Sequence, residues 1–527
     1  MTMRSGRNMS RDRAEALNTK IGGFAMYRER NPLPEASPES LGISSGNIAA
    51  FIEALRKTQY NMHGFMILRH GKIAAEAYYA PFRKEDRHRM YSTSKSFTAV
   101  AVGMLADEGK IRLNDKIASY FPEKITGQLH PYTADAEIRD LLMMASPFSA
   151  TTYGFIDDVD WIRTYFTAKP DHRPGQVFWY ETSATTVLAA LVEKLTGMRL
   201  LDYLRSKGFD EMGFSEDAEC VLSPDGAVSW TGSGILCRLR DLAKFALLCL
   251  NKGEYQGRQL VSREYMEQAT SRQIDNGAYG YGYFFWMMED GFCCRGLGGQ
   301  MAYCFPEKDL ILVTVGDDQL NGDSRIQMME TLFRQTVYDN IRTENLDEDP
   351  AACEALRKLC TELRIQTVKG QYANPLAQKV SGKTYRMTPP ETERNTHFET
   401  IRFDFEEDRG VLRWTMDGED HALAFGLGHF EKQIFPGFSS EEETAGRPIL
   451  IYGYKGRKQP LYLPVYTSAA WQSDHELRLI CYSIGINVGT LDMRFSFDEN
   501  WLTVHTRPHT EWMWTELSGM QSGEASL

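Results

Sequence analysis

The sequence contains 527 residues, of which 42% are hydrophobic and 25% are charged, and its formal net charge is −12. A chain of this length exceeds what one hydrophobic core usually holds, so we expect more than one globular domain. The excess of acidic over basic residues disfavours a nucleic-acid partner, because a phosphate backbone repels a negatively charged surface. No run approaches the roughly 18 apolar residues of a transmembrane helix, so we expect no membrane partner either.

The N-terminal segment and the cysteines indicate a compartment. Residues 1–13 lack the apolar stretch of a signal peptide. The nine cysteines are odd in number and lack the spacing of a disulfide framework, which is typical of a reducing interior. We therefore expect a cytoplasmic protein. Residues 1–37 are polar and are predicted to form an N-terminal arm.

An apparent nucleophile motif near the start of the chain has a simpler interpretation. Residues 42–46 match Gly-x-Ser-x-Gly, the pattern of a nucleophile elbow. An elbow requires an apolar strand before it, whereas residues 34–41 are rich in proline, glutamate and serine. We interpret this segment as a serine cap that begins a helix over residues 47–55.

The segment from Met90 to Leu105 places a hydroxyl and an amine one helical turn apart at the start of an apolar helix. Ser92 and Lys95 form the Ser-x-x-Lys pattern of serine acyl-transfer enzymes. Residues three positions apart share a helix face, so a neutral Lys95 could accept the proton of the Ser92 hydroxyl. Burial and the positive helix N-terminus both disfavour the charged ammonium. The alternative is that Ser92 caps the helix and Lys95 points into water, which the short motif alone would favour.

The surrounding sequence supports the catalytic interpretation. Residues 105–122 continue the pattern, and four more stretches occur in a recognisable order, namely 65–78, 137–146, 174–184 and 232–245. Together these motifs resemble the serine β-lactamase and penicillin-binding-protein superfamily. The likeness is greatest to its class C β-lactamase branch, which includes esterases and 6-aminohexanoate-oligomer hydrolases. It extends from about residue 38 to residue 340, and ordered motifs over that length are more specific than any single one.

The resemblance implies a catalytic tyrosine. Tyr180, Glu181 and Thr182 occupy the place of the family's Tyr-x-Asn triplet, in which the tyrosine relays a proton between the nucleophile and the leaving group. Tyr180 matches this pattern, but Thr182 lacks the amide that would hold the lysine and a substrate carbonyl together. Tyr180 could instead be an aromatic core residue beside Phe178 and Trp179. Its position before a helix predicted over residues 184–195 favours catalysis.

The resemblance also implies a substrate-binding strand. The best candidate begins the hairpin of residues 295–315, where Leu297 stands in the place of a family His or Lys. This replacement removes the charge that binds a substrate carboxylate in β-lactamases and carboxypeptidases. Gly298 and Gly299 would let substrate lie against the strand, and the backbone N–H groups of Gln300 and Ser92 would form the oxyanion hole. Structural glycines in a tight bend are the competing explanation.

The histidines and cysteines argue against other catalytic chemistry. No histidine occurs between His172 and His397, and His88 lies among charged residues on a predicted solvated loop. A Ser-His-Asp triad is therefore not expected. The chain contains neither His-Glu-x-x-His nor paired Cys-x-x-Cys, so we expect no metal site and no cofactor.

The predicted elements divide the chain into an α/β (α+β) catalytic domain and a β-rich domain. Residues 38–342 should form a β-lactamase/transpeptidase-like domain, whose antiparallel sheet of early and late strands is flanked by helices. Residues 343–370 contain a connecting helix. Residues 371–527 alternate apolar and polar side chains, which predicts an antiparallel barrel or curved sheet, somewhat lipocalin-like. This domain could bind substrate, cover the active-site mouth or mediate formation of a homo-oligomer.

Three functions remain open at this point. The first is a serine hydrolase that cleaves a small-molecule ester or amide through a Ser92 acyl-enzyme. The second is a β-lactamase or a D-alanyl-D-alanine carboxypeptidase-like penicillin-binding enzyme, which Leu297 and the missing export signal weaken. The third is a catalytically silent homologue that binds a ligand, which Thr182 and Leu297 favour and the intact Ser92, Lys95 and Tyr180 oppose.

Overall fold

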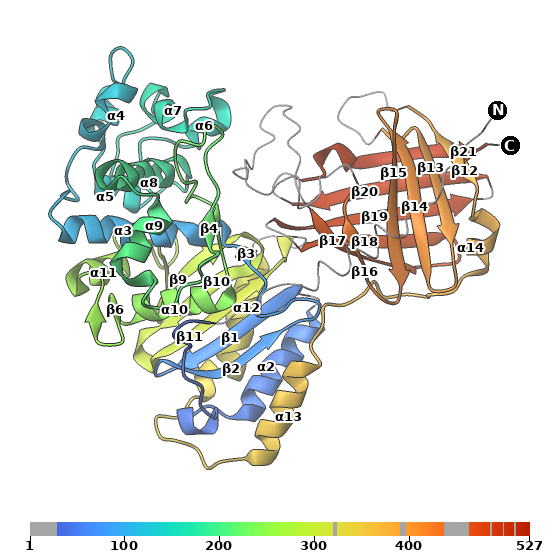
Figure 1. Cartoon of the computed structure of the whole chain (residues 1–527), viewed down its shortest axis with the longest axis horizontal. Helices are drawn as coiled ribbons and strands as arrows, with labels where there is room; N and C mark the ends of the chain where they lie inside the picture. The colour runs from blue at the N-terminus through green and yellow to red at the C-terminus, as the bar shows by residue number, and fades with distance from the viewer. Residues whose placement is uncertain are drawn as a thin grey trace, which may run out of the picture.

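The computed structural model describes residues 29–58, 60–319, 324–389, 397–436, 463–484, 487–498, 500–510 and 513–526. Figure 1 shows an N-terminal body of helices around a sheet and, beside it, a barrel made by the C-terminal strands. The mixed α and β architecture with a C-terminal β-barrel confirms the predicted fold class. None of the described helices is both long enough and apolar enough to cross a membrane.

The N-terminal body is organised around a six-stranded antiparallel sheet with strand order β2-β1-β11-β10-β9-β8. Its strands are β1 (Met62–Arg69), β2 (Lys72–Tyr78), β8 (Trp286–Met288), β9 (Gly291–Gly296), β10 (Gln300–Phe305) and β11 (Leu310–Gly316). Strands from both ends of the domain sequence therefore meet in one sheet, as predicted. β1, β10 and β11 are buried along their whole length, because helices cover both faces of the sheet.

Each face of this sheet packs on its own set of helices. One face is covered by α2 (Ser45–Lys57), α12 (Ser324–Thr336) and α13 (Pro350–Thr361), which share a hydrophobic cluster with β1, β10 and β11. The other face packs on a larger cluster that contains α3 (Ser94–Asp107), α8 (Ser183–Thr196) and α10 (Leu239–Leu250). The predicted connecting helix thus corresponds to α13, which packs against α2 in the N-terminal body (Figure 1).

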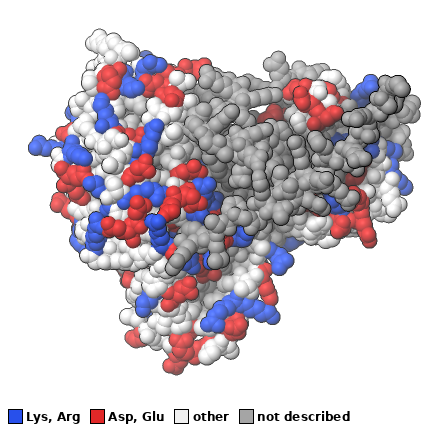
Figure 2. Space-filling view, in the orientation of Figure 1, with Lys and Arg blue, Asp and Glu red and all other residues white. Residues whose placement is uncertain are grey.

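Shorter elements complete the N-terminal body. The helices are α4 (Pro131–Asp135), α5 (Ile138–Leu142), α6 (Thr152–Phe155), α7 (Trp161–Thr167), α9 (Leu200–Leu204) and α11 (Arg263–Ala269). The strands are β3 (His88–Arg89), β4 (Glu219–Cys220), β5 (Ile235–Cys237), β6 (Glu254–Tyr255) and β7 (Arg258–Gln259). On the described surface drawn in Figure 2, acidic and basic side chains are interspersed over this body.

The C-terminal strands close into a barrel. In order they are β12 (Thr384–Met387), β13 (Thr400–Phe405), β14 (Arg409–Met416), β15 (Glu419–Leu427), β16 (Glu431–Ile434), β17 (Pro464–Trp471), β18 (Glu476–Ile484), β19 (Val488–Asp498), β20 (Trp501–His509) and β21 (Gly519–Ala525), with α14 (Pro375–Val380) before them. Neighbouring strands pair antiparallel as predicted, but a short parallel pairing of β15 with β17 closes the ring and leaves β16 outside it, paired with β17. Alternate side chains fill the interior with a separate hydrophobic cluster.

The structure differs from the sequence expectation at His88. The prediction that His88 lies on a solvated loop is wrong, because its side chain is buried in β3 and lies 3.1 Å from His63 through ring nitrogens. The prediction relied on charged neighbours, but Arg89 is itself buried and donates to the Ser233 backbone at 2.8 Å.

In the described part of the predicted arm, Leu33 packs into the core, and Glu29 forms a 3.0 Å ion pair with Lys244.

Candidate active site

Ser92 and Lys95 lie together where a short 3₁₀ turn (Tyr91–Thr93) leads into α3. The Lys95 Nζ atom is 3.0 Å from Ser92 Oγ and donates to the carbonyl oxygen of Gly232 at 2.5 Å. Lys95 is only 1% exposed, because α3 runs through the core with apolar side chains on every face. The solvated-lysine alternative is therefore excluded by the structure.

Thr182 lies against the residue that binds Lys95. A Cβ atom on Gly232 would fall 2.2 Å from Thr182 Cγ2, so only glycine fits between the threonine methyl group and the Lys95 acceptor. The Thr182 backbone N–H donates to Thr151 Oγ1 at 3.0 Å, which fixes the loop. The side chain that replaces the family asparagine thus packs near the lysine through its methyl group.

Tyr180 stands over Lys95 and beside an aromatic cluster. Lys95 Nζ lies 5.0 Å from the centre of the Tyr180 ring, within the range of a cation–π contact. The same ring is 5.4 Å from Trp286, which also contacts Phe178 and Tyr281. Tyr180 is half-buried, so the structure brings it to the edge of the Ser92 site.

Glu181 holds the Tyr180 loop, a role that the motif comparison did not identify. Its buried carboxylate accepts hydrogen bonds from the backbone N–H groups of Ser183 at 2.7 Å and Ala184 at 2.9 Å, and from Ser146 Oγ at 2.9 Å. These bonds satisfy the free N–H groups at the start of α8. Burial raises the pKa of Glu181, which the hydrogen bonds partly oppose. An acidic residue just before a helix was the available sequence signal.

The glycine-rich segment lies beside the nucleophile. Thr93 Oγ1 donates to the Gln300 carbonyl at 2.6 Å, and a Cβ on Gly296 would fall 2.3 Å from the Met90 carbonyl oxygen. The start of β10 and the Ser92 turn are therefore in direct contact. The buried Gln300 amide donates to the Leu297 carbonyl at 2.9 Å and so closes the turn before β10.

The predicted glycines form a turn rather than a continuous strand. Gly298 and Gly299 have φ angles of +76° and +98°, which disfavour side chains with a Cβ atom. A Cβ on Gly299 would also collide with Tyr60 Oη at 1.8 Å. Both glycines are thus required by the bend. Leu297 precedes them and is 38% exposed at the rim of the site.

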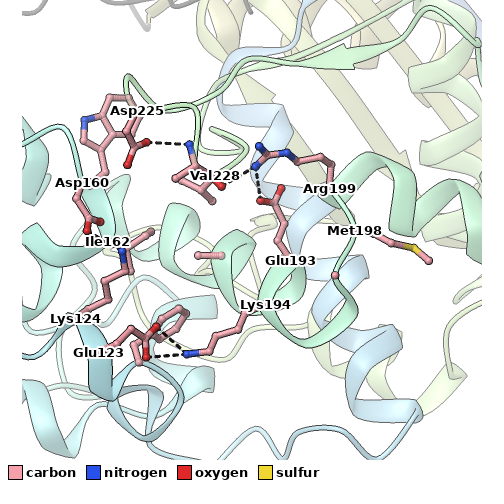
Figure 3. Close-up of a pocket in the computed structure, with 15 residues that line it drawn as sticks. Glu123, Lys124, Asp160, Ile162, Glu193, Lys194, Met198, Arg199, Asp225 and Val228 are labelled. Atoms are coloured by element: carbon pink, nitrogen blue, oxygen red, sulfur yellow. Dashed lines mark hydrogen bonds and ion pairs between the residues drawn. The ribbon is translucent and has the colours of Figure 1, made fainter.

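A separate hollow of about 420 Å³ is lined in part by the C-terminal end of α8, whereas Tyr180 precedes the N-terminal end of this helix. Figure 3 shows the side chains that line this hollow. Six of its charged side chains are in ion pairs: Lys124 with Asp160 at 2.7 Å, Lys194 with Glu123 at 2.8 Å and Arg199 with Glu193 at 3.0 Å. The seventh, Asp225, accepts hydrogen bonds from Ser223 Oγ at 2.5 Å and from the Ala227 N–H at 3.0 Å. Ser92 is not among its lining residues. We therefore assign the catalytic candidate to the Ser92 turn and not to this hollow.

One group of possible metal ligands occurs within the described ranges, at Glu39, Glu348 and Cys353. The buried Glu39 carboxylate already accepts from the Ser45 N–H at 2.8 Å, from Ser45 Oγ at 3.1 Å and from Cys353 Sγ at 3.0 Å. These bonds explain the grouping without an ion. None of its members contacts the Ser92 turn through a recorded hydrogen bond.

The family model named Beta-lactamase matches residues 48–328, which include the Ser92 turn, the Tyr180 loop and the glycine turn. The chain belongs to the β-lactamase family. Over 224 residues it is 28% identical to the 6-aminohexanoate-dimer hydrolase of Paenarthrobacter ureafaciens. That match covers 39% of this chain and 56% of the relative, so the chain spans little more than half of that protein's length.

Solved structures of β-lactamase-like proteins are also similar to this chain. A Bacillus anthracis protein provisionally described as a 6-aminohexanoate-dimer hydrolase has a TM-score of 0.49 and 21% identity, covering 62% of this chain and 94% of that one. An octameric penicillin-binding protein homologue from Pyrococcus abyssi has a TM-score of 0.41 and 15% identity. It covers 91% of this chain and 99% of its own.

Proposed function

We propose that this protein is a serine hydrolase that cleaves a small-molecule ester or amide through an acyl-enzyme on Ser92. The observation that carries the proposal is the 3.0 Å contact between Ser92 Oγ and a fully buried Lys95 amine. A serine hydroxyl is a weak nucleophile, and an adjacent base within hydrogen-bond reach activates it. A catalytically silent homologue would have no need to keep this pair in contact.

In the proposed reaction, a neutral Lys95 takes the proton of the Ser92 hydroxyl as the oxygen attacks the substrate carbonyl. Tyr180, which lies over the amine, passes a proton to the leaving group and later takes one from the deacylating water. As the acyl group leaves, Lys95 returns its proton to Ser92 Oγ, so both groups regain their starting protonation. The oxyanion is held by the backbone N–H groups of Ser92 and Gln300. The hydrogen bond from Thr93 to the Gln300 carbonyl supports this pairing, because it keeps the two backbone segments in contact.

The rim of the site favours a neutral, apolar acyl group. Leu297 is exposed where carboxylate-binding relatives keep a cation, and Trp286 and Tyr180 form an aromatic wall nearby. A substrate carboxylate beside Leu297 would lose hydration without a compensating charge. The Arg295 guanidinium lies 5.2 Å from the centre of the Trp286 ring, so this aromatic side chain already engages it. We therefore place ester and amide substrates ahead of β-lactams, the family's alternative.

A substrate panel tests this proposal. Short-chain p-nitrophenyl esters should turn over faster than nitrocefin, and an arylamide with the same acyl group should turn over more slowly than its ester. Intact mass after a fluorophosphonate or penicillin treatment reports any acyl-enzyme. Nitrocefin hydrolysis that rivals ester hydrolysis would restore the β-lactamase function, and the absence of both turnover and adduct would favour the silent homologue.

We also propose that the protein works in a reducing compartment. All nine cysteines are described, and each is a free thiol, including Cys293 and Cys294, which are adjacent in β9. Disulfides are rare in the cytoplasm and common outside it. Protein denatured without reductant should therefore titrate nine thiols, and a lower number would contradict this assignment.

A further inference from the structure

Residues 487–490, which begin β19 and belong to the β18–β19 hairpin of the barrel, contact the N-terminal body beside the Ser92 turn. Arg89 Nη1 in β3 donates to Asn487 Oδ1 at 2.7 Å, and Tyr91 Oη donates to the Val488 carbonyl at 3.1 Å. Figure 1 shows this end of the barrel lying beside β3. Arg89, Tyr91, Asn487 and Val488 are each no more than 2% exposed, so this contact is part of the protein interior.

The same hairpin also contacts the segment after β11, which is hydrogen-bonded to the glycine turn. Thr490 Oγ1 donates to Asp317 Oδ2 at 2.7 Å, and Gln319 Nε2 donates to the Val488 carbonyl at 2.8 Å. Asp317 and Gln319 follow β11, next to Asp318, whose N–H donates to the Gly298 carbonyl at 3.1 Å. The Val488 carbonyl therefore receives one hydrogen bond from the nucleophile side and one from the glycine-turn side.

Tyr91, the residue before Ser92, has a backbone conformation that needs outside support. Its φ angle is +47°, in the left-handed region that bulky side chains disfavour. Such residues persist where the surrounding structure holds them, and they concentrate at functional sites. The Tyr91 ring is held between the Val488 carbonyl at its hydroxyl and the Arg89 guanidinium, which lies 4.5 Å from the ring centre.

Arg89 links this support to the lysine. Its guanidinium donates to the Ser233 carbonyl at 2.8 Å and to Ser233 Oγ at 2.9 Å. Ser233 follows Gly232, whose carbonyl accepts from Lys95. Asn487 therefore binds an arginine that fixes the segment carrying the Lys95 acceptor. Displacing the hairpin would loosen both the nucleophile turn and the lysine's partner.

We propose that residues 487–490, at the start of β19, are a positioning element of the active site, acting through Tyr91 and Arg89 on the placement of Ser92 and Lys95. This inference rests on the proposed function of Ser92. It gives the C-terminal barrel a part in positioning the catalytic residues, because the N-terminal body alone lacks the acceptors at Asn487 and Val488. Tyr91 is then a positioning residue and not a catalytic one.

Tyr91→Phe tests the inference by removing the hydroxyl while keeping the ring. We expect kcat for a p-nitrophenyl ester and the rate of fluorophosphonate labelling at Ser92 to fall by about tenfold or more, because small misplacements of reacting groups are costly. KM and the melting temperature should change little. The matched control is Tyr385→Phe, since Tyr385 is equally buried in β12 and its hydroxyl has no recorded hydrogen bond.

Thr490→Val tests the same inference from the barrel side, far along the chain from Ser92. It removes the hydrogen bond to Asp317 with little change in shape, and we expect kcat and labelling to fall with KM retained. This variant also keeps the test available if Tyr91→Phe does not fold. A lower melting temperature with an unchanged kcat, in either variant, would mean that the hairpin has only a structural role. That result would overturn the inference.

The wild-type protein separates this inference from the function on which it rests. Wild-type labelling at Ser92, together with unchanged labelling rates in Tyr91→Phe and Thr490→Val, would overturn the positioning role and leave the proposed hydrolase intact. A wild-type protein that takes no label at Ser92 would overturn both.

Discussion

Lys95 Nζ lies 3.0 Å from Ser92 Oγ and, on its other side, 2.5 Å from the Gly232 carbonyl oxygen. The amine is thus held between its proposed proton donor and a fixed backbone acceptor, inside a core where α3 leaves it 1% exposed. This geometry leaves the lysine side chain few other orientations. Position 232 requires a glycine, because a Cβ atom there would fall 2.2 Å from Thr182 Cγ2.

Replacing the amine should separate catalysis from folding. Lys95→Met keeps most of the side-chain volume and removes the base, so we expect ester hydrolysis to fall by about 100-fold or more. The matched control is Lys244→Met, because Lys244 is also fully buried and donates to the Gly213 carbonyl at 2.9 Å in α10. The melting temperature of the control variant should fall, and its kcat should stay unchanged. Equal effects of the two variants on kcat would contradict the base role.

The phenol of Tyr180 should matter for turnover more than for stability. Tyr180→Phe keeps the ring against Trp286, so the melting temperature should hold, while kcat falls by about 100-fold through loss of the proton relay. Tyr165→Phe serves as the control, since Tyr165 is buried with no recorded hydrogen bond to its hydroxyl. Full activity in Tyr180→Phe would assign the ring to packing.

Leu297 should set the preference for neutral acyl groups. Leu297→Lys restores a cation at the rim, and we expect the ratio of nitrocefin to p-nitrophenyl ester hydrolysis to rise by about tenfold, as a charge-assisted contact with a substrate carboxylate forms. Met198→Lys places the same charge at another exposed position, in the hollow at the C-terminal end of α8. It should leave the ratio unchanged, and an unchanged ratio in Leu297→Lys would remove Leu297 from the specificity argument.

The buried pair of His63 and His88 should make the fold acid-sensitive. Burial lowers the pKa of His88 from 6.5 to about 4 and lowers that of His63 as well. Between pH 6.5 and 4 the unfolded chain binds protons at these histidines that the folded chain does not bind. Their contribution to the free energy of unfolding is therefore fully present above about pH 6.5 and is lost as the pH falls toward 4. Together the two histidines should contribute on the order of 3 kcal/mol to the free energy of unfolding over this window.

Urea unfolding at several pH values measures this effect. His88→Gln removes one of the titrating groups, so its free energy of unfolding should depend less steeply on pH between 6.5 and 4 than that of the wild type. His475→Gln is the control, because His475 is exposed in the barrel. Parallel pH profiles for the wild type and His88→Gln would show that the pair does not titrate on unfolding.

Local sequence patterns were sufficient to predict the Ser92 and Lys95 contact, the early and late strands that meet in the N-terminal sheet, and an antiparallel C-terminal β domain. A three-residue spacing fixes which side chains share a helix face, and alternation fixes which side of a strand is buried. The burial of His88 was not predictable in this way. Its charged neighbour Arg89 is buried because distant groups satisfy it, among them Asn487, 398 positions along the chain.

Features that depend on contacts between domains could not be predicted from local sequence either. The left-handed conformation of Tyr91 and its hydrogen bond to Val488 depend on where the barrel docks. The parallel pairing of β15 with β17 depends on ring closure rather than on any strand's own alternation. The role of Glu181, by contrast, was predictable from local sequence, because an acidic residue just before a helix can accept hydrogen bonds from the first N–H groups of that helix.

The most direct test of the whole account is the site of covalent labelling. Wild-type protein and Ser92→Ala are treated with a fluorophosphonate, and intact mass and peptide mapping locate the adduct. We expect one adduct per wild-type chain, on the peptide that contains Ser92, and none on Ser92→Ala, with equal melting temperatures. An adduct on another residue, or equal labelling of Ser92→Ala, would contradict the assignment of Ser92 as the nucleophile.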